Sequence, residues 1–179
     1  TGADDLAVAV QALRDGGVVA YPTETFYGLA ADPRSESAVK KIFSIKQRSP
    51  DHALPLIAAS IAQIADHVGS MTPLATRLAS RAWPGPLTLI IPASPRLCRD
   101  VHHSTGRVAV RVPADSIARA LAASAGHAIT STSANISGEA PSSTADQVAA
   151  ALGEGIDVLI DAGRAGAIAW DRVLEFLLS

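Results

Sequence analysis

A dense group of polar side chains lies within residues 20–32, directly after a short apolar run. Two hydroxyls, a carboxylate and a phenol follow one another at Thr23, Glu24, Thr25 and Tyr27. Together they offer hydrogen-bond donors and acceptors, and Gly28 then lets the backbone approach something closely. The segment therefore predicts a site for a polar ligand, and an ordinary polar loop after a strand is the alternative.

Two cations, Lys46 and Arg48, stand at the expected C-terminal end of a helix. A lysine ammonium is a mobile point charge and an arginine guanidinium a fixed fork, and both suit phosphate oxygens. Cations at a helix C-terminus also interact favourably with the helix dipole. A phosphate contact and a solvated helix end are therefore both open interpretations.

Hydroxyl and amide side chains gather in the run Ser131-Thr132-Ser133-Ala134-Asn135, after an expected strand. Open α/β sheets place ligands at the carboxyl ends of their strands, which favours a binding role. Serine and asparagine also commonly satisfy the backbone of their own turn, which is the alternative.

One charged residue, Arg111, interrupts the apolar run Val108–Val112. A buried charge must be paired, because burying it alone is costly. A structural ion pair with Glu24 is one interpretation of this position.

Hydrophobic spacing and capping signals predict the elements that position these residues. Helices are expected at 6–13, 36–46, 61–67, 73–82, 116–124 and 145–152, with capping boxes beginning at Ser60 and Thr144. Strands are expected at 18–20, 54–59, 87–91, 107–112, 128–132 and 158–160, and Pro22 should end the first or place it at an edge. Residues 92–106 are expected to be irregular. The mixture predicts one α/β domain over 1–179.

Five ordered motifs resemble the YrdC-like family, the threonylcarbamoyl-AMP synthases of tRNA modification. They are Tyr21-Pro22-Thr23-Glu24-Thr25-Phe26-Tyr27-Gly28-Leu29, Lys46-Gln47-Arg48, Trp83-Pro84-Gly85-Pro86-Leu87-Thr88, Val110-Arg111-Val112-Pro113 and Ser131-Thr132-Ser133-Ala134-Asn135-Ile136-Ser137-Gly138. The chain looks most like the short, single-domain bacterial members. The resemblance implies a twisted open mixed sheet, flanked by helices, around a central concave site.

The resemblance also implies an activity and a set of contacts. The chain would join L-threonine, bicarbonate and ATP into threonylcarbamoyl-AMP and release pyrophosphate. The nucleotide would be held by Lys46, Arg48, His52, Ser133, Asn135 and Ser142, with Lys46 and Arg48 as the catalytic cations. Threonine would be held by Thr23, Thr25, Tyr27, Arg111 and Ser131. For His52, a surface loop histidine is the alternative.

The same resemblance implies partners. Magnesium would arrive with the ATP phosphates, and no dedicated metal site is expected. A separate transferase complex would use the product on adenosine 37 of tRNA.

The sequence departs from the family pattern in three places. Ala114-Asp115-Ser116 stands where many members have a histidine, and Ile57 stands near a position where a histidine helps to hold threonine. The run 167–172 replaces a Gly-x-x-Ser-Thr-Val ending. These departures leave part of the threonine pocket unassigned.

Composition limits the other classes of function. The net charge of −2 shows no global basic field, which argues against double-stranded RNA binding as the main role, although weak RNA binding stays open. A carbamoyl-transfer domain of the same fold is a further alternative. Cys98 is the one cysteine, so neither a disulfide framework nor a cysteine-based zinc site is expected. The adjacent pair His102-His103 should point apart on a strand, without a third metal ligand.

The location expected from the sequence is the cytoplasm. The acidic start of the sequence is unlike a signal peptide. No apolar run approaches the length of a membrane span.

Overall fold

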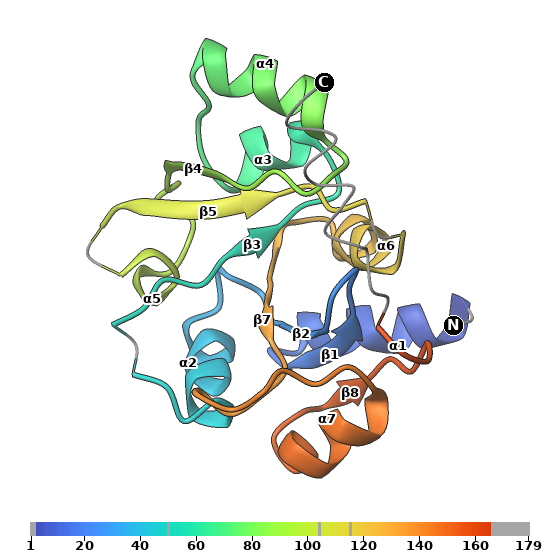
Figure 1. Ribbon diagram of the computed structural model, residues 1–179. Helices are drawn as coiled ribbons and strands as arrows, with labels where there is room; N and C mark the ends of the chain where they lie inside the picture. Colours follow the sequence, from blue (N-terminus) through green and yellow to red (C-terminus); the bar gives the residue numbers. More distant parts are fainter. Residues whose placement is uncertain (1–2, 50, 104, 115, 166–179) are drawn as a thin grey trace.

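The chain folds into two four-stranded mixed sheets with helices packed around them (Figure 1). The computed structural model describes residues 3–49, 51–103, 105–114 and 116–165. The strand order is β7-β2-β1-β8 in the first sheet and β4-β5-β3-β6 in the second. The strands are β1 Val19–Pro22, β2 Tyr27–Ala30, β3 Leu56–Ile57, β4 Leu89–Pro92, β5 Arg107–Arg111, β6 Ile129–Thr130, β7 Thr132–Ser133 and β8 Val158–Leu159. The expected α/β class is confirmed, and the strands divide between two sheets.

The helices described are α1 Ala3–Arg14, α2 Glu36–Ile45, α3 Ile61–His67, α4 Pro73–Ala82, α5 Arg99–His102, α6 Ser116–Ala125 and α7 Ala145–Leu152. Four of them, α2, α3, α4 and α7, begin after a residue whose side chain caps them. The hydroxyls of Ser60 and Thr144 accept the N–H of Gln63 and Gln147, as expected of capping boxes. Each glutamine reaches back one residue further than the motif requires, to the N–H of the residue before the cap.

The short helix α5 corrects the expectation that residues 92–106 are irregular. It also corrects the strand expected at the two adjacent histidines. His102 is the last residue of α5, and His103 follows it with a positive φ of 50°. Within the described ranges, no group of three or more His, Cys, Asp and Glu side chains is placed to hold a metal ion.

The polar stretch forms the turn of a hairpin. Strand β1 ends at Pro22, as expected of a residue without an N–H donor, and pairs antiparallel with β2 in the register Val19↔Ala30 to Pro22↔Tyr27. The sequence did not predict β2. Residues 23–26 therefore form the tip of the hairpin.

One expected strand splits between the two sheets. Within the segment 128–132, β6 pairs with β3 in the second sheet, whereas β7 pairs with β2 in the first. The break falls at Ser131, whose N–H donates to the carbonyl of Pro55 over 2.8 Å. Figure 1 shows this segment passing from the upper sheet to the lower one. Ser131 thus lies where the two sheets meet.

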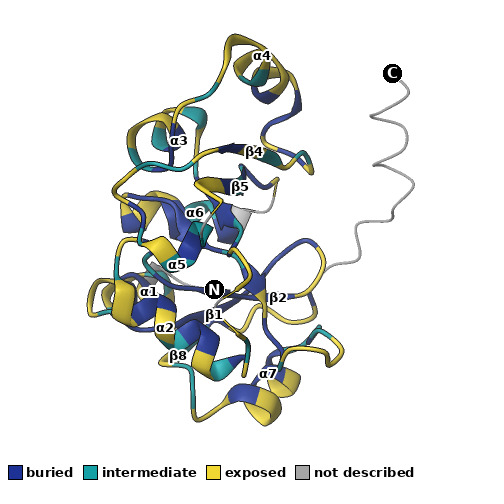
Figure 2. Cartoon of the chain, turned by 90° about the vertical axis from the view of Figure 1, so that its left-hand side faces the viewer, coloured by how far each residue is buried: buried dark blue, intermediate teal, exposed yellow. Residues whose placement is uncertain are grey.

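Buried apolar residues fill the space on both sides of the sheets. One cluster includes Leu29, Ile42 and Val110, and a second packs α1 and α6 against strands of both sheets through Leu13, Leu121 and Ile129. Figure 2 shows that burial concentrates on the strands and inner helix faces, whereas most of α4 is exposed. None of the helices in the described part of the chain combines the length and apolar character of a membrane span.

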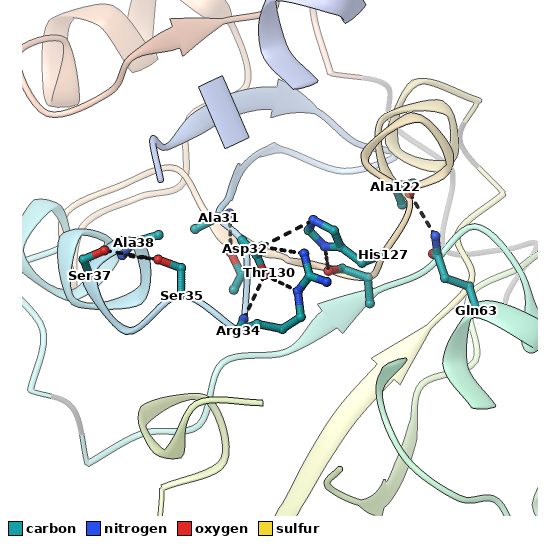
Figure 3. A network of polar contacts seen from close by, with 11 residues as sticks. Ala31, Asp32, Arg34, Ser35, Ser37, Ala38, Gln63, Ala122, His127 and Thr130 are labelled. Carbon is teal, nitrogen blue, oxygen red and sulfur yellow. Dashed lines mark hydrogen bonds and ion pairs between the residues drawn. The ribbon is translucent and has the colours of Figure 1, made fainter. Parts of the chain in front are cut away.

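A network of polar contacts, exposed at Arg34 and buried at His127, joins the segment before α2 to the segment that leads into β6 (Figure 3). Arg34 donates two side-chain hydrogen bonds to Asp32, from Nε over 2.9 Å and from Nη2 over 2.7 Å. Burial alone would raise the pKa of Asp32, but the hydrogen bonds from Arg34 outweigh it and hold the pKa below its usual value. The Nε2 atom of His127 lies 3.5 Å from the same carboxylate, and burial lowers the pKa of this imidazole.

Candidate functional site

A cavity of about 250 Å³ opens between the two sheets. Its wall comes from the β1–β2 hairpin, from β3, from the end of β5 and from the β6–β7 crossover. Six of the residues expected to bind ligand line it: Thr23, Thr25, Tyr27, Arg111, Ser131 and Ser133. The fold therefore brings together residues that lie far apart in the sequence.

The hydroxyl of Thr23 shapes the hairpin tip. Its Oγ1 atom donates to the carbonyl of Phe26 over 2.6 Å and accepts the N–H of Thr25 and Phe26 over 3.3 and 3.4 Å. The Thr23 hydroxyl is thus occupied by the turn, whereas Thr25 is exposed at the cavity, with its Oγ1 atom 3.4 Å from that of Thr23.

The two tyrosines of the hairpin anchor it to other segments. Tyr21 donates its phenol proton to Oγ of Ser131 over 3.0 Å, and Tyr27 donates to the carbonyl of Gly163 over 2.7 Å. Burial raises the pKa of Tyr27, so this phenol stays protonated at neutral pH. Tyr27 therefore fixes the cavity wall to the segment at Gly163, and Tyr21 orients Ser131.

Gly28 is required by the close approach of Tyr21, and we expect Gly28→Ala to displace that ring. A Cβ atom at this position would lie 3.2 Å from Cζ and 3.3 Å from the hydroxyl oxygen of Tyr21. The substitution should lower the free energy of unfolding by about 1–3 kcal/mol, because the ring is buried and cannot move freely. Urea unfolding would measure this change. Equal stability of G28A and wild type would contradict the expectation.

A salt bridge spans the gap between the sheets at the cavity. Arg111, the last residue of β5, places Nη2 3.0 Å from Oε2 of Glu24 in the hairpin tip. The Glu24 side chain is 8% exposed and the Arg111 side chain 24% exposed. The ion pair that the sequence left open is present, and Arg111 also lines the cavity. A guanidinium has five N–H donors, so pairing with one carboxylate oxygen leaves donors for a second anion.

Lys46 contacts Ser133 but does not line the cavity, and it is 2% exposed. Its ammonium donates to the carbonyls of Ser133 and Asn135 over 2.5 and 2.8 Å and to Oδ1 of Asn135 over 3.2 Å. Burial, and to a smaller extent the charge of Arg48, lower the pKa of Lys46 to about 8. The amine is therefore still largely protonated at pH 7.

The remaining expected residues are not part of the cavity wall. Arg48 is half-buried, His52 is exposed on the loop after α2, and Ser142 is buried. The carbonyl of Ser142 accepts the N–H of Tyr27 over 2.8 Å, which ties it to the start of β2. Among the described residues, no carboxylate forms a salt bridge with Arg48.

The cavity has further wall residues that the sequence did not assign to it. They include Phe26, Pro55, Leu56 and Thr88, and Ile57 lies in the same wall. Ile57 stands near the position where the resemblance implies a histidine, so this part of the wall is apolar. Thr88 belongs to the Trp83–Thr88 motif, which was the signal that could have identified it. Asp115 and residues 167–172, two of the three departures, lie outside the described residues.

Comparison with known proteins gives a consistent set of similarities. Residues 11–177 match the Sua5/YciO/YrdC family model, described as telomere recombination. A threonylcarbamoyl-AMP synthase of Idiomarina loihiensis is 38% identical over 175 residues, which cover 97% of this chain and 94% of that protein.

Two solved structures are similar as well. P. abyssi Sua5 complexed with L-threonine matches with a TM-score of 0.84 and 39% identity, over 89% of this chain and 47% of that one. This chain thus spans about half the length of Sua5. Full-length HypF in its phosphate- and nucleotide-bound form matches with a TM-score of 0.79 at 18% identity, over 91% of this chain and 25% of that one, and so shows the fold alone.

Proposed function

This chain belongs to the Sua5/YciO/YrdC family, and from that premise we propose that it is an L-threonylcarbamoyladenylate synthase. The threonine amine forms a bond to the carbon of bicarbonate, and water leaves. A carbamate oxygen then attacks the α-phosphorus of ATP, and pyrophosphate leaves. The reaction is a nucleotidyl transfer, and the product is threonylcarbamoyl-AMP.

The observation that carries the proposal is the position of Arg111 in a hydroxyl-lined cavity between the sheets. A guanidinium suits a carboxylate, because two parallel N–H donors match its two oxygens. Arg111 would hold the carboxylate of threonine, and Thr25 and Ser131 would bind its other polar groups. The Sua5 structure that this chain resembles was solved with L-threonine.

The nucleotide would lie beside this cavity, over the loop that carries Ser133. Ser133 lines the cavity with an exposed side chain, and Arg48 is half-exposed at the end of α2. His52 and Ser142 are the outer candidates for nucleotide contact. The reactants are anionic or zwitterionic, so positive charge and preorganised donors can lower the barrier without a protein nucleophile. Magnesium would enter as part of the ATP substrate.

Purified protein supplied with threonine, bicarbonate, Mg-ATP and pyrophosphatase should form threonylcarbamoyl-AMP only when threonine and bicarbonate are both present. Chromatography of the products would measure this dependence. Threonine-independent turnover would favour carbamoyl transfer instead. Absence of turnover, with double-stranded RNA binding that weakens steeply as salt rises, would favour an RNA-binding module.

The labile product would be consumed by a separate transferase that acts on adenosine 37 of tRNA. An enzyme in that sequence of reactions would work in the cytoplasm, where tRNA is modified. Addition of the transferase and tRNA to the assay should convert the product into N6-threonylcarbamoyladenosine.

A further inference from the structure

Lys46 and Asn135 form a closed polar cluster beneath the candidate nucleotide site. An ammonium has three N–H donors, and the three acceptors around Nζ are the carbonyls of Ser133 and Asn135 and the Oδ1 atom of Asn135. Because Lys46 is 2% exposed, these contacts replace the water that its ammonium would otherwise bind.

The Asn135 carboxamide is satisfied in the same way. Lys46 donates to Oδ1, which fixes the orientation of the amide, and Nδ2 donates to the carbonyls of Ile136 and Glu139 over 2.9 and 2.8 Å. The N–H of Ser137 then donates to the carbonyl of Lys46 over 2.9 Å. These bonds bind the whole loop 133–139 to the end of α2.

The backbone turns Lys46 and Arg48 to different environments. Between them, Gln47 adopts a positive φ of 48°, which ends the helical path. Lys46 is buried in the cluster, whereas Arg48 is half-exposed. The two cations of one short motif therefore differ: the three N–H donors of the Lys46 ammonium are occupied, whereas the Arg48 guanidinium faces solvent in part.

We infer that Lys46 and Asn135 are positioning residues, which hold the loop that presents Ser133, whereas Arg48 and Ser133 contact the nucleotide itself. This inference rests on the proposed function. It assigns different roles to four residues that the sequence grouped as nucleotide ligands. Loss of either member of the cluster releases the same loop.

Calorimetric titration with ATP and with AMP, at two salt concentrations, tests this division of roles. Arg48→Ala should weaken the binding of ATP more than the binding of AMP, because it removes a positive charge at the phosphates. For the same reason it should reduce the salt dependence of binding. Lys46→Met and Asn135→Ala should each weaken the binding of ATP and of AMP by the same factor, about tenfold. Both variants should keep the wild-type salt dependence of binding. The double variant should bind each nucleotide as well as the single variant with the lower affinity, since both substitutions act through one loop.

Other results would overturn the inference. Lys46 would be a direct phosphate ligand if Lys46→Met reduced the affinity for ATP much more than the affinity for AMP, and if this effect added to that of Asn135→Ala. A wild-type chain that binds neither nucleotide would overturn the proposed function and the inference together. Normal nucleotide binding without threonylcarbamoyl-AMP synthesis would overturn the proposed function alone.

Lys46→Met removes a buried ammonium, so a measurement on the wild-type chain is also needed. In protein with ¹⁵N-labelled lysine, the Lys46 ammonium should give a signal protected from exchange by its three bonds. Saturating Mg-ATP should leave that protection in place. Loss of the protected signal on ATP addition would show that the ammonium leaves the cluster, and would contradict the inference.

Discussion

Arg48→Ala should lower the rate of threonylcarbamoyl-AMP formation by about 100- to 1000-fold, since removing one preorganised donor to developing charge costs about that much. Arg48 is half-exposed, and no carboxylate of the described residues pairs with it. Its guanidinium can therefore keep its hydrogen bonds to the phosphate oxygens while pyrophosphate leaves. Lys46 cannot replace it, because the Lys46 ammonium already donates to three acceptors.

The fold should tolerate this substitution. A half-exposed side chain without an ion pair contributes little to stability, so the free energy of unfolding should change by less than about 0.5 kcal/mol. Steady-state kinetics and urea unfolding measure the two effects separately. Arg77→Ala, which removes an exposed arginine from α4, is the matched control and should retain full activity. Full activity of R48A would refute the phosphate assignment.

Arg111→Lys should raise KM for threonine by about 30- to 100-fold, while KM for ATP changes less than about twofold. Lysine keeps the positive charge but loses the planar fork, so it cannot bind a carboxylate through two parallel bonds. It can still pair with Glu24, which limits the loss of stability. The factor corresponds to about 2–3 kcal/mol of binding free energy.

Two further variants make this result specific. Arg14→Lys changes an exposed arginine at the end of α1, outside the cavity wall, and should leave both KM values unchanged. Glu24→Gln keeps an acceptor for Arg111 but removes the charge, so its KM for threonine should lie between those of wild type and R111K. Equal increases in KM for threonine and for ATP in R111K would place Arg111 outside the amino-acid half of the site.

Elements set by local interactions were predictable from the sequence. A cap hydroxyl bonds to a backbone N–H three residues away, so Ser60 and Thr144 identify the start of a helix without reference to the rest of the chain. Pro22 ends β1 because its ring removes a donor, wherever the strand lies in the sheet. The strand β2 was missed, because its pairing depends on the turn that Thr23 closes.

Residue chemistry and motif order were also determined by the sequence alone, and they were sufficient to predict the family. Tertiary structure decided which groups meet. Glu24 and Arg111 are 87 positions apart, and Lys46 and Asn135 are 89 apart, so neither contact follows from local spacing. The strength of a salt bridge or hydrogen bond depends on distance and burial in space. Only the fold could therefore separate the buried Lys46, which holds a loop, from the half-exposed Arg48, which keeps its charge available.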